Sequence, residues 1–364
     1  MSPLRRTLAA WPPLLQWSVL LLLSLLISLL WGAMGLPAAL LLGPMLGGVV
    51  FGVNGVRLGV PRWPYTGAQG VIGAMVTMAM TPAIVTTLGS HVLLFAVVMA
   101  ATLIGAAAIG WLISRSGLIP GGTAVYGTSP GAASAMVLLG EAEGADTQLV
   151  AFMQYSRVLL VALAAALVAH WWAGGVTAHP PAAAAWAVPV HWGKLALVLV
   201  LIAVGQQLAR LLRLPAWELL GPMLLLSVLH AGGWLTVELP RWLLAAAYAL
   251  VGWHIGLGFR REALRHAGRA LPVVLAAALC LMGLCGALAW CLMQLAHVDA
   301  LTAYLATSPG GMDSVAIIAA STPRVDLPFV LALQAVRLLF VIALAPFITR
   351  LVVRYSPHLQ ISRG

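Results

Sequence analysis

Charged side chains are scarce in this chain of 364 residues. Asp, Glu, Lys and Arg make up 8% of it and hydrophobic residues 62%, and the apolar runs recur at lengths that suit a bilayer, which a helix crosses with roughly 20 residues. The net charge of +10 comes from Lys and Arg scattered along the chain, without the basic cluster that is typical of nucleic-acid binding. The composition therefore predicts an integral membrane protein with no nucleic-acid partner.

Motifs for metal, nucleotide and covalent chemistry are also lacking. The cysteines, Cys280, Cys285 and Cys291, lie in one apolar segment without a CxxC spacing, so they indicate core residues rather than a disulfide framework or a zinc site. The histidines form no HxH or HExxH pattern, and no GxGxxG, Walker or nucleophile-elbow motif stands in a suitable setting. We therefore predict no cofactor, no metal and no enzymatic activity.

What the chain does contain is an internal duplication. A shift of about 179 residues brings short tracts into register in the same order along both halves. The pairs are Leu36-Pro37 with Leu214-Pro215, Gly43-Pro44-Met45 with Gly221-Pro222-Met223, Pro61-Arg62-Trp63 with Pro240-Arg241-Trp242, Thr128-Ser129-Pro130-Gly131 with Thr307-Ser308-Pro309-Gly310, and Gln154-x-x-Arg157 with Gln334-x-x-Arg337. The duplication predicts a first membrane repeat over residues 1–170, a connector over 171–192 and a second membrane repeat over 193–364.

Each repeat contains six apolar segments, and the charges between them indicate how many cross the membrane. The segments lie near 14–31, 36–53, 67–88, 91–112, 120–140 and 148–169, then near 193–211, 215–230, 242–259, 271–296, 300–321 and 327–349. Twelve crossings would place ten Lys and Arg residues inside and seven outside. If the fifth segment of each repeat enters and returns on one side, fourteen lie inside and only Lys194, Arg241 and Arg324 outside, which fits the positive-inside rule better.

The second arrangement predicts the fold class. Five crossings per repeat is an odd number, so we expect an all-α integral membrane protein of two inverted repeats, each with five transmembrane helices and one re-entrant or broken half-helix. Inverted repeats with interrupted helices are an architecture of secondary transporters. Both chain termini are then cytoplasmic.

The fifth segments carry the Thr-Ser-Pro-Gly tracts. Ser129 suits an N-cap and Pro130 the first helical position, which predicts a half-helix from Pro130 to Gly140, roughly 16 Å long. Ser308 and Pro309 predict a second half-helix that enters from the opposite side. The two helix N-termini would face each other and form a site for an anionic or polar ligand. The alternative interpretation is an ordinary loop between two helices.

Two arginines fall near the middle of apolar segments. Arg157 and Arg337 would cost about 2.5–3.5 kcal/mol each in the bilayer, so they should face a cavity or a partner. Gln154 and Gln334 lie three positions earlier, on the same helical face. These side chains are candidates for solute binding. Structural ties to loop carbonyls or to the half-helix are the alternative, and the two roles can coexist.

Acidic residues distinguish the second repeat from the first. Asp313 lies early in the second half-helix and Glu218 begins a membrane segment, so each is a candidate for coupling to a proton or another cation. Alternatively, Asp313 complements the helix dipole or pairs with Arg337 without titrating. The predicted site comprises Thr128, Ser129, Gly131, Gln154, Arg157, Thr307, Ser308, Gly310, Gln334 and Arg337 for binding, with Asp313 and Glu218 for ion coupling.

The two tracts also carry a family resemblance. YGTSPGAASAMVLLGEAEGAD and ATSPGGMDSVAIIAASTPRVD, each followed by Gln-x-x-Arg, resemble the membrane AbrB family, and the resemblance covers nearly the whole chain. It implies an internally duplicated bacterial membrane protein, with members labelled as ammonia monooxygenases or as regulators of gene expression. A copper or iron monooxygenase needs clustered ligands and a DNA-binding regulator needs a soluble reading head, and the sequence contains neither.

We therefore expect a secondary transporter of the bacterial inner membrane. A small polar or anionic solute would bind at the two half-helix ends and cross by alternating access. The alternative, from the family labels, is a membrane protein that regulates gene expression or an ammonia monooxygenase. The sequence leaves the solute, the coupling ion and the oligomeric state open, a homodimer included.

Overall fold

The computed structural model describes most of the chain. It covers residues 11–34, 36, 38–79, 92–119, 121–130, 136–137, 140–141, 143–172, 191–214, 216–260, 268, 270–322 and 325–354. At 78, 79, 92, 121, 312, 313, 335, 338, 339, 342, 343, 345, 346 and 349–354 it describes the backbone alone. The two chain ends, for which the charges predict a cytoplasmic location, lie outside these ranges.

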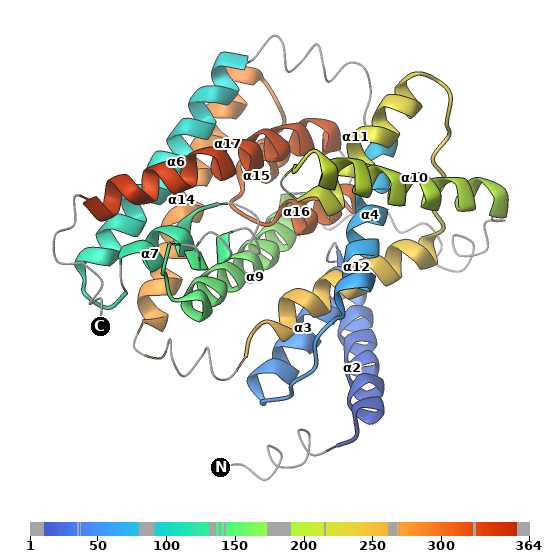
Figure 1. The fold of residues 1–364 in the computed structure, drawn as a ribbon, viewed down its shortest axis with the longest axis horizontal. Helices are drawn as coiled ribbons and strands as arrows, with labels where there is room; N and C mark the ends of the chain where they lie inside the picture. The colour runs from blue at the N-terminus through green and yellow to red at the C-terminus, as the bar shows by residue number, and fades with distance from the viewer. Residues whose placement is uncertain are drawn as a thin grey trace.

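Every regular element within the described ranges is an α-helix (Figure 1). The helices are α2 (Pro13–Ala33), α3 (Ala39–Val53), α4 (Arg62–Ala79), α6 (Val92–Arg115), α7 (Gly121–Thr128), α9 (Thr147–Trp172), α10 (Trp192–Leu211), α11 (Trp217–Ala231), α12 (Arg241–Leu257), α14 (Leu271–Ala296), α15 (Ala300–Thr307), α16 (Met312–Ala320) and α17 (Leu327–Arg354). Five of them, α2, α6, α9, α10 and α14, are long and apolar enough to cross a membrane. The chain is a helical membrane protein.

The helices pack as two groups, and each group draws on both halves of the chain. The first group contains α2, α3 and α4 with α10, α11 and α12, and in it α3 packs on α12 and α4 on α11. The second group contains α6, α7 and α9 with α14, α15, α16 and α17. Contacts of α4 with α16 and α17, and of α12 with α9, connect the groups. The main partners of several helices therefore come from the other half.

Glycines allow the close packing between halves in the first group. A Cβ at Gly252 of α12 would lie 2.5 Å from the backbone oxygen of Leu41 in α3. At the equivalent crossing, a Cβ at Gly73 of α4 would lie 2.5 Å from the backbone oxygen of Leu219 in α11. Backbone atoms cannot move aside as a flexible side chain can, so each crossing needs a residue without a Cβ. The same contact thus joins the halves twice.

A proline inside α11 explains one buried glutamine. Pro222 has no N–H, so the carbonyl of Glu218, four residues earlier, has no donor within its helix. Gln206 of α10 donates to this oxygen from Nε2 at 2.9 Å, and Nε2 lies 2.8 Å from the carbonyl oxygen of Thr66 in α4. One amide side chain thus ties three helices of the first group together.

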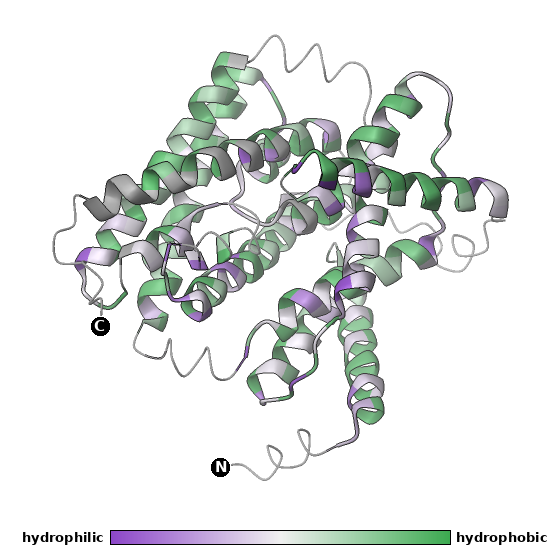
Figure 2. Ribbon diagram, viewed as in Figure 1, coloured by the Kyte–Doolittle hydropathy of each residue, from purple (hydrophilic) through white to green (hydrophobic). Residues whose placement is uncertain are grey.

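Apolar residues predominate along the long helices (Figure 2), and many of their large apolar side chains are exposed. Leu14 and Leu22 of α2 are 84% and 62% exposed, and Leu211 at the end of α10 is 79% exposed. Faces of this kind suit lipid rather than water, because exposing apolar surface to water costs about 25 cal/mol per Å². Cys280 of α14 is exposed as well. The prediction that all the cysteines are core residues is therefore wrong for Cys280.

Helices occupy both ends of the predicted connector. α9 continues through Trp172 and α10 begins at Trp192, whereas residues 173–190 lie outside the described ranges. Near the start of α10, Lys194 Nζ lies 2.7 Å from Glu238 Oε1 in the segment before α12. The hydrogen bond from Lys194 lowers the pKa of Glu238 below its ordinary value. This ion pair attaches α10 to the α11–α12 connection.

We expect Gly252→Ala to destabilise the protein, because the added Cβ would clash with the backbone oxygen of Leu41. Overpacking of this kind costs about 1–3 kcal/mol, so the melting temperature of the detergent-purified protein should fall by several degrees. Gly283→Ala in α14 is the matched control, since a Cβ there meets nothing within 4 Å. Equal melting temperatures for Gly252→Ala and the wild type would contradict the close crossing.

Candidate functional site

The second Thr-Ser-Pro-Gly tract separates two short helices. α15 ends at Thr307 and α16 begins at Met312, with Gly311 as its N-cap. Ser308 is the C-cap of α15, and its Oγ donates to the carbonyl of Leu305 at 3.0 Å. The predicted break is present, but the prediction that Ser308 caps the start of the next half-helix is wrong. The Ser308 hydroxyl bonds to the preceding helix, α15, because α16 starts only after Gly311.

The first tract ends its helix in the same way. α7 stops at Thr128, and the Oγ of Ser129 donates to the carbonyl of Val125 at 2.7 Å. Ser129 is thus also bonded to the helix before it. Gly131 and the rest of 131–135 lie outside the described residues, as does part of the predicted half-helix from Pro130 to Gly140. This half-helix stays a prediction.

The two threonines attach the short helices to long neighbours. Thr128 Oγ1 lies 3.1 Å from the carbonyl oxygen of Ala106 in α6, and Thr307 Oγ1 lies 3.0 Å from that of Cys285 in α14. Each hydroxyl is also close to a carbonyl four residues earlier in its own helix. Both threonines are buried. Their visible role is to position the break, although the sequence predicts them as solute ligands.

The two glutamines bind carbonyl groups at these helix ends. Gln154 Nε2 donates to the carbonyls of Tyr126 and Ser129 at 2.7 and 3.0 Å. Gln334 Nε2 donates to the equivalent pair, Leu305 and Ser308, at 2.9 and 3.2 Å. Both glutamines are fully buried. Each therefore supplies donors that the interrupted helix lacks.

The two arginines bind the same helix ends. Arg157 Nη1 donates to the carbonyl of Ser129 at 2.7 Å, and Arg337 Nη1 donates to that of Ser308 at 2.5 Å. Each arginine also donates from Nη2 to the side-chain oxygen of the glutamine three residues before it. Arg157 is 2% and Arg337 3% exposed. The prediction that Gln and Arg share one helical face is confirmed in both halves.

These contacts resolve two electrostatic problems together. A helix that ends in apolar surroundings leaves carbonyls without donors and carries partial negative charge at its C-terminus. A buried guanidinium needs acceptors for its N–H groups and negative potential for its charge. The ends of α7 and α15 supply both to Arg157 and Arg337. The arrangement matches the interpretation of the arginines as structural ties.

The hydrogen bonds of Arg337 leave little capacity for a direct ligand. Nη1 also lies 3.3 Å from the carbonyl oxygen of Thr307, and Nη2 donates to the carbonyl of Gly310 at 3.1 Å. With Ser308 and Gln334, these contacts use the Nη donors of a group that has five N–H bonds in all. A solute can therefore feel the positive charge of Arg337 without displacing these bonds.

The start of α16 offers donors beside the break. Its first backbone bond runs from the Val315 N–H to the Gly311 carbonyl at 3.0 Å. The first N–H groups of a helix generally lack acceptors within the helix itself. Asp313 is the second residue of α16, although its side chain is outside the description.

The other predicted coupling residue lies in the other helical group. Glu218 is in the first turn of α11 and is half-buried. α11 packs on α4 and α10, whereas both Thr-Ser-Pro-Gly tracts belong to the second group. The structure therefore does not bring Glu218 together with the tracts.

Comparison with known proteins identifies a family that matches most of the chain. Residues 40–353 match the family described as "Transition state regulatory protein AbrB". The chain belongs to the AbrB family. The family resemblance of the two tracts is thereby confirmed.

Two curated proteins match this chain over most of their own length. An Escherichia coli protein named "Putative regulator AbrB" is 43% identical over 345 residues, which is 95% of this chain and 99% of the relative. A Bacillus subtilis protein named "Uncharacterized protein YhjN" is 27% identical over 312 residues, or 80% of this chain and 78% of the relative. The likeness thus extends through both repeats.

The structure of this AbrB member also contains an aromatic cluster that the sequence interpretation missed. The rings of Tyr65 and His254 stack with centroids 3.9 Å apart, and Tyr155 meets His254 edge-on at 6.4 Å. The three residues come from α4, α12 and α9. No local motif joins them, so the only sequence signal was the presence of polar aromatic residues within apolar segments.

We expect Arg337→Lys to destabilise this AbrB protein, because one ammonium group cannot reach the carbonyls that the guanidinium spans. Leaving buried carbonyls without donors costs about 1–3 kcal/mol, which a lower melting temperature in detergent would report. Arg241→Lys, at the exposed start of α12, is the control. If Arg337→Lys has the same melting temperature as the wild type, the hydrogen bonds of Arg337 to the carbonyls are not needed for stability.

Proposed function

We propose that the chain is a secondary transporter of a small polar or anionic solute in the bacterial inner membrane, working by alternating access. The observation that carries the proposal is the division of the helices into two groups that each combine both halves, with both Thr-Ser-Pro-Gly tracts in the second group. Broken helices at a repeat interface, moving against a second group of helices, are an architecture of secondary transporters.

The repetition of local contacts in the two halves supports the duplication on which this proposal rests. The same local contacts recur: Thr123 Oγ1 accepts from the Asp146 N–H at 3.0 Å, and Thr302 Oγ1 from the Asp326 N–H at 3.1 Å. The distribution of Lys and Arg favours an odd number of crossings per repeat. On the outer side that it predicts, Lys194 is paired with Glu238. We infer five crossings and one half-helix per repeat, with both termini cytoplasmic.

In this proposal the solute contacts the backbone of the break. The N–H groups at the start of α16 supply donors and partial positive charge. Gln334 and Arg337 hold the neighbouring carbonyls in place and add charge that attracts an anion over a short distance. Gln154 and Arg157 have the equivalent role at the first tract. A small anionic or polar solute is the ligand class that suits such a site.

Coupling to a proton or another cation is part of the same proposal. Asp313 is the better candidate of the two acidic residues, because its backbone lies in the first turn of α16, next to the break. Glu218 belongs to the first helical group. A carboxylate within a membrane segment is a common coupling group in transporters.

The name of the Escherichia coli relative, which includes "regulator", suggests a second candidate function. An effect on gene expression can arise indirectly when a transporter changes the level of a solute in the cell. Regulation and transport are compatible under this interpretation, and the chain needs no DNA-binding part of its own for it.

The first test is solute flux in vesicles that contain the purified protein. We expect at least one solute from a panel of small organic acids, amino acids and sugars to enter faster than into empty vesicles. Arg337→Gln should abolish that flux, because the break loses its support, whereas the exposed control Arg241→Gln should retain it. Unchanged flux in Arg337→Gln and in Arg157→Gln would contradict the assigned role of the arginines.

Relative motion of the helical groups can be tested by cross-linking. Leu58 precedes α4 in the first group, Gln148 lies in α9 of the second, and both line one cavity. In a background with the native cysteines replaced, we expect a reducible cross-linker between Leu58→Cys and Gln148→Cys to stop the flux, and a reductant to restore it. A cross-link between Leu58→Cys and Leu257→Cys, both on the first group's side of this cavity, should leave transport intact. Full transport with the first pair cross-linked would rule out alternating access by these groups.

Metal analysis of the pure protein separates transport from the oxygenase alternative. We expect substoichiometric copper and iron, because solute transport at a backbone site requires neither. Stoichiometric copper or iron that survives chelation would favour the oxygenase instead.

A further inference from the structure

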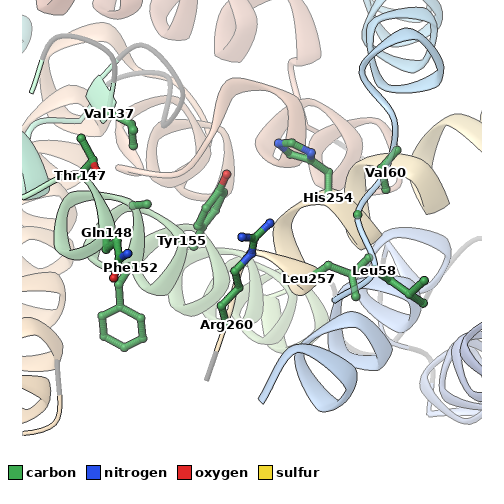
Figure 3. Close-up of a pocket in the computed structure, with 13 residues that line it drawn as sticks. Leu58, Val60, Val137, Thr147, Gln148, Phe152, Tyr155, His254, Leu257 and Arg260 are labelled. Carbon is green, nitrogen blue, oxygen red and sulfur yellow. The ribbon is translucent and has the colours of Figure 1, made fainter. Parts of the chain in front are cut away.

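A cavity of about 370 Å³ lies between the two helical groups (Figure 3). Side chains of α9 form one wall, the end of α12 forms another, and residues 58–60, between α3 and α4, close a third. Its volume falls in the range of about 300–1,000 Å³ that small-molecule sites occupy. The cavity is thus large enough for a small ligand, and it is separate from the hydrogen bonds at the Thr-Ser-Pro-Gly tracts.

The polar groups of the cavity favour a negative ligand. Arg260 and His254 line it, together with Tyr155 and Gln148. None of the described residues that line it is Asp or Glu. In Figure 3 the side chain of Arg260 lies beside those of Tyr155 and His254. Arg260 is exposed, and a guanidinium beside a partly enclosed, largely apolar space can bind carboxylate or phosphate through charge-assisted hydrogen bonds.

The two aromatic residues of the cavity, His254 and Tyr155, are each packed against a neighbouring residue. The ring of His254 stacks on Tyr65 with an angle of 24° between the planes. The ring of Tyr155 packs against Gly258, where a Cβ would lie 2.8 Å from a ring carbon. Rings positioned in this way offer flat apolar surface at low entropic cost, and they suit a planar ligand body.

The repeat does not explain these residues. The shift of about 179 residues that aligns the halves places Met75 opposite His254, and the matching of Gln154 with Gln334 places Ala335 opposite Tyr155. Neither aromatic residue therefore recurs at the equivalent position of the other half. A requirement of the fold would be expected in both halves, whereas a requirement of an asymmetric ligand is met once.

We propose that this cavity binds a small organic anion whose carboxylate or phosphate contacts Arg260 and whose planar apolar body lies against Tyr155 and His254. The headgroup of an anionic phospholipid offers the same charge chemistry from a second source. The proposal of a binding site depends on the cavity and not on the proposed function. Only the further step, that the bound anion is carried across the membrane, rests on the proposed function.

The experiment measures binding to the wild-type protein in phosphatidylcholine nanodiscs by calorimetry and thermal stabilisation. Benzoate and phenyl phosphate are the probes. We expect saturable binding of at least one of them. Benzyl alcohol lacks the charge, while acetate and inorganic phosphate lack the ring, so each should bind at least about tenfold more weakly.

Matched variants connect the binding to the cavity. Arg260→Gln should weaken binding of the aromatic anions at least about tenfold, whereas Arg260→Lys, which keeps the charge, should retain most of it. Arg241→Gln removes a positive charge at the exposed start of α12 and should leave the dissociation constant unchanged. Equal melting temperatures without ligand show that each variant is folded.

The outcomes separate the two sources and the two proposals. Benzoate binding that is equal in phosphatidylcholine and phosphatidylglycerol discs supports the small anion, whereas its loss in phosphatidylglycerol discs overturns the small anion in favour of a lipid headgroup. No saturable binding, or binding that Arg260→Gln leaves unchanged, overturns the site. Binding of an aromatic anion without flux of that anion keeps the site and refutes its carriage across the membrane. Flux of another solute without binding of the aromatic anions keeps transport and overturns the site.

Discussion

The interrupted helices depend on one constraint, which is that backbone carbonyls buried in apolar surroundings need donors. α7 and α15 both stop inside the molecule, where water cannot supply the missing hydrogen bonds. A Gln and an Arg on the next long helix supply them, by the same geometry in each half. The buried positive charge, which is unfavourable by itself, becomes favourable beside a helix C-terminus. Break and arginine therefore need each other.

The division into two helical groups follows from the way the halves interlock. In the first group, glycine crossings bring backbones into direct contact, which leaves little freedom for relative movement. In the second group, the short helices are held through hydrogen bonds of side chains to carbonyls. One hydrophobic core cluster spans the two groups, with Leu41 and Val71 from the first and Ala162 and Phe329 from the second. An aromatic cluster and a cavity also lie between them. The alternating access proposed above therefore requires this shared packing to rearrange.

Much of this was accessible from the sequence, because bilayer length and duplication constrain it strongly. Apolar segments at 14–31 and 193–211 predicted α2 and α10 closely, and the paired tracts predicted the breaks. The prediction that Ser308 is an N-cap was wrong. Ser-Pro is a common signal for a helix start, and nothing in the local sequence shows that α16 begins only after Gly311. The cavity was invisible because Tyr155 and His254 lie far apart in the chain and meet only through packing.

The glycine crossings also determine when helices of the first group can pack against their partners during translation. α3 finds its glycine-lined partner in α12, and α4 fits against α11. Neither α12 nor α11 exists when translation has passed only the first repeat. The faces of α3 and α4 that pack on them are therefore uncovered at that stage. The amino-terminal half must remain in the membrane as an incomplete assembly until α12 has emerged. A single repeat could have avoided this waiting period only by pairing with a second copy of itself.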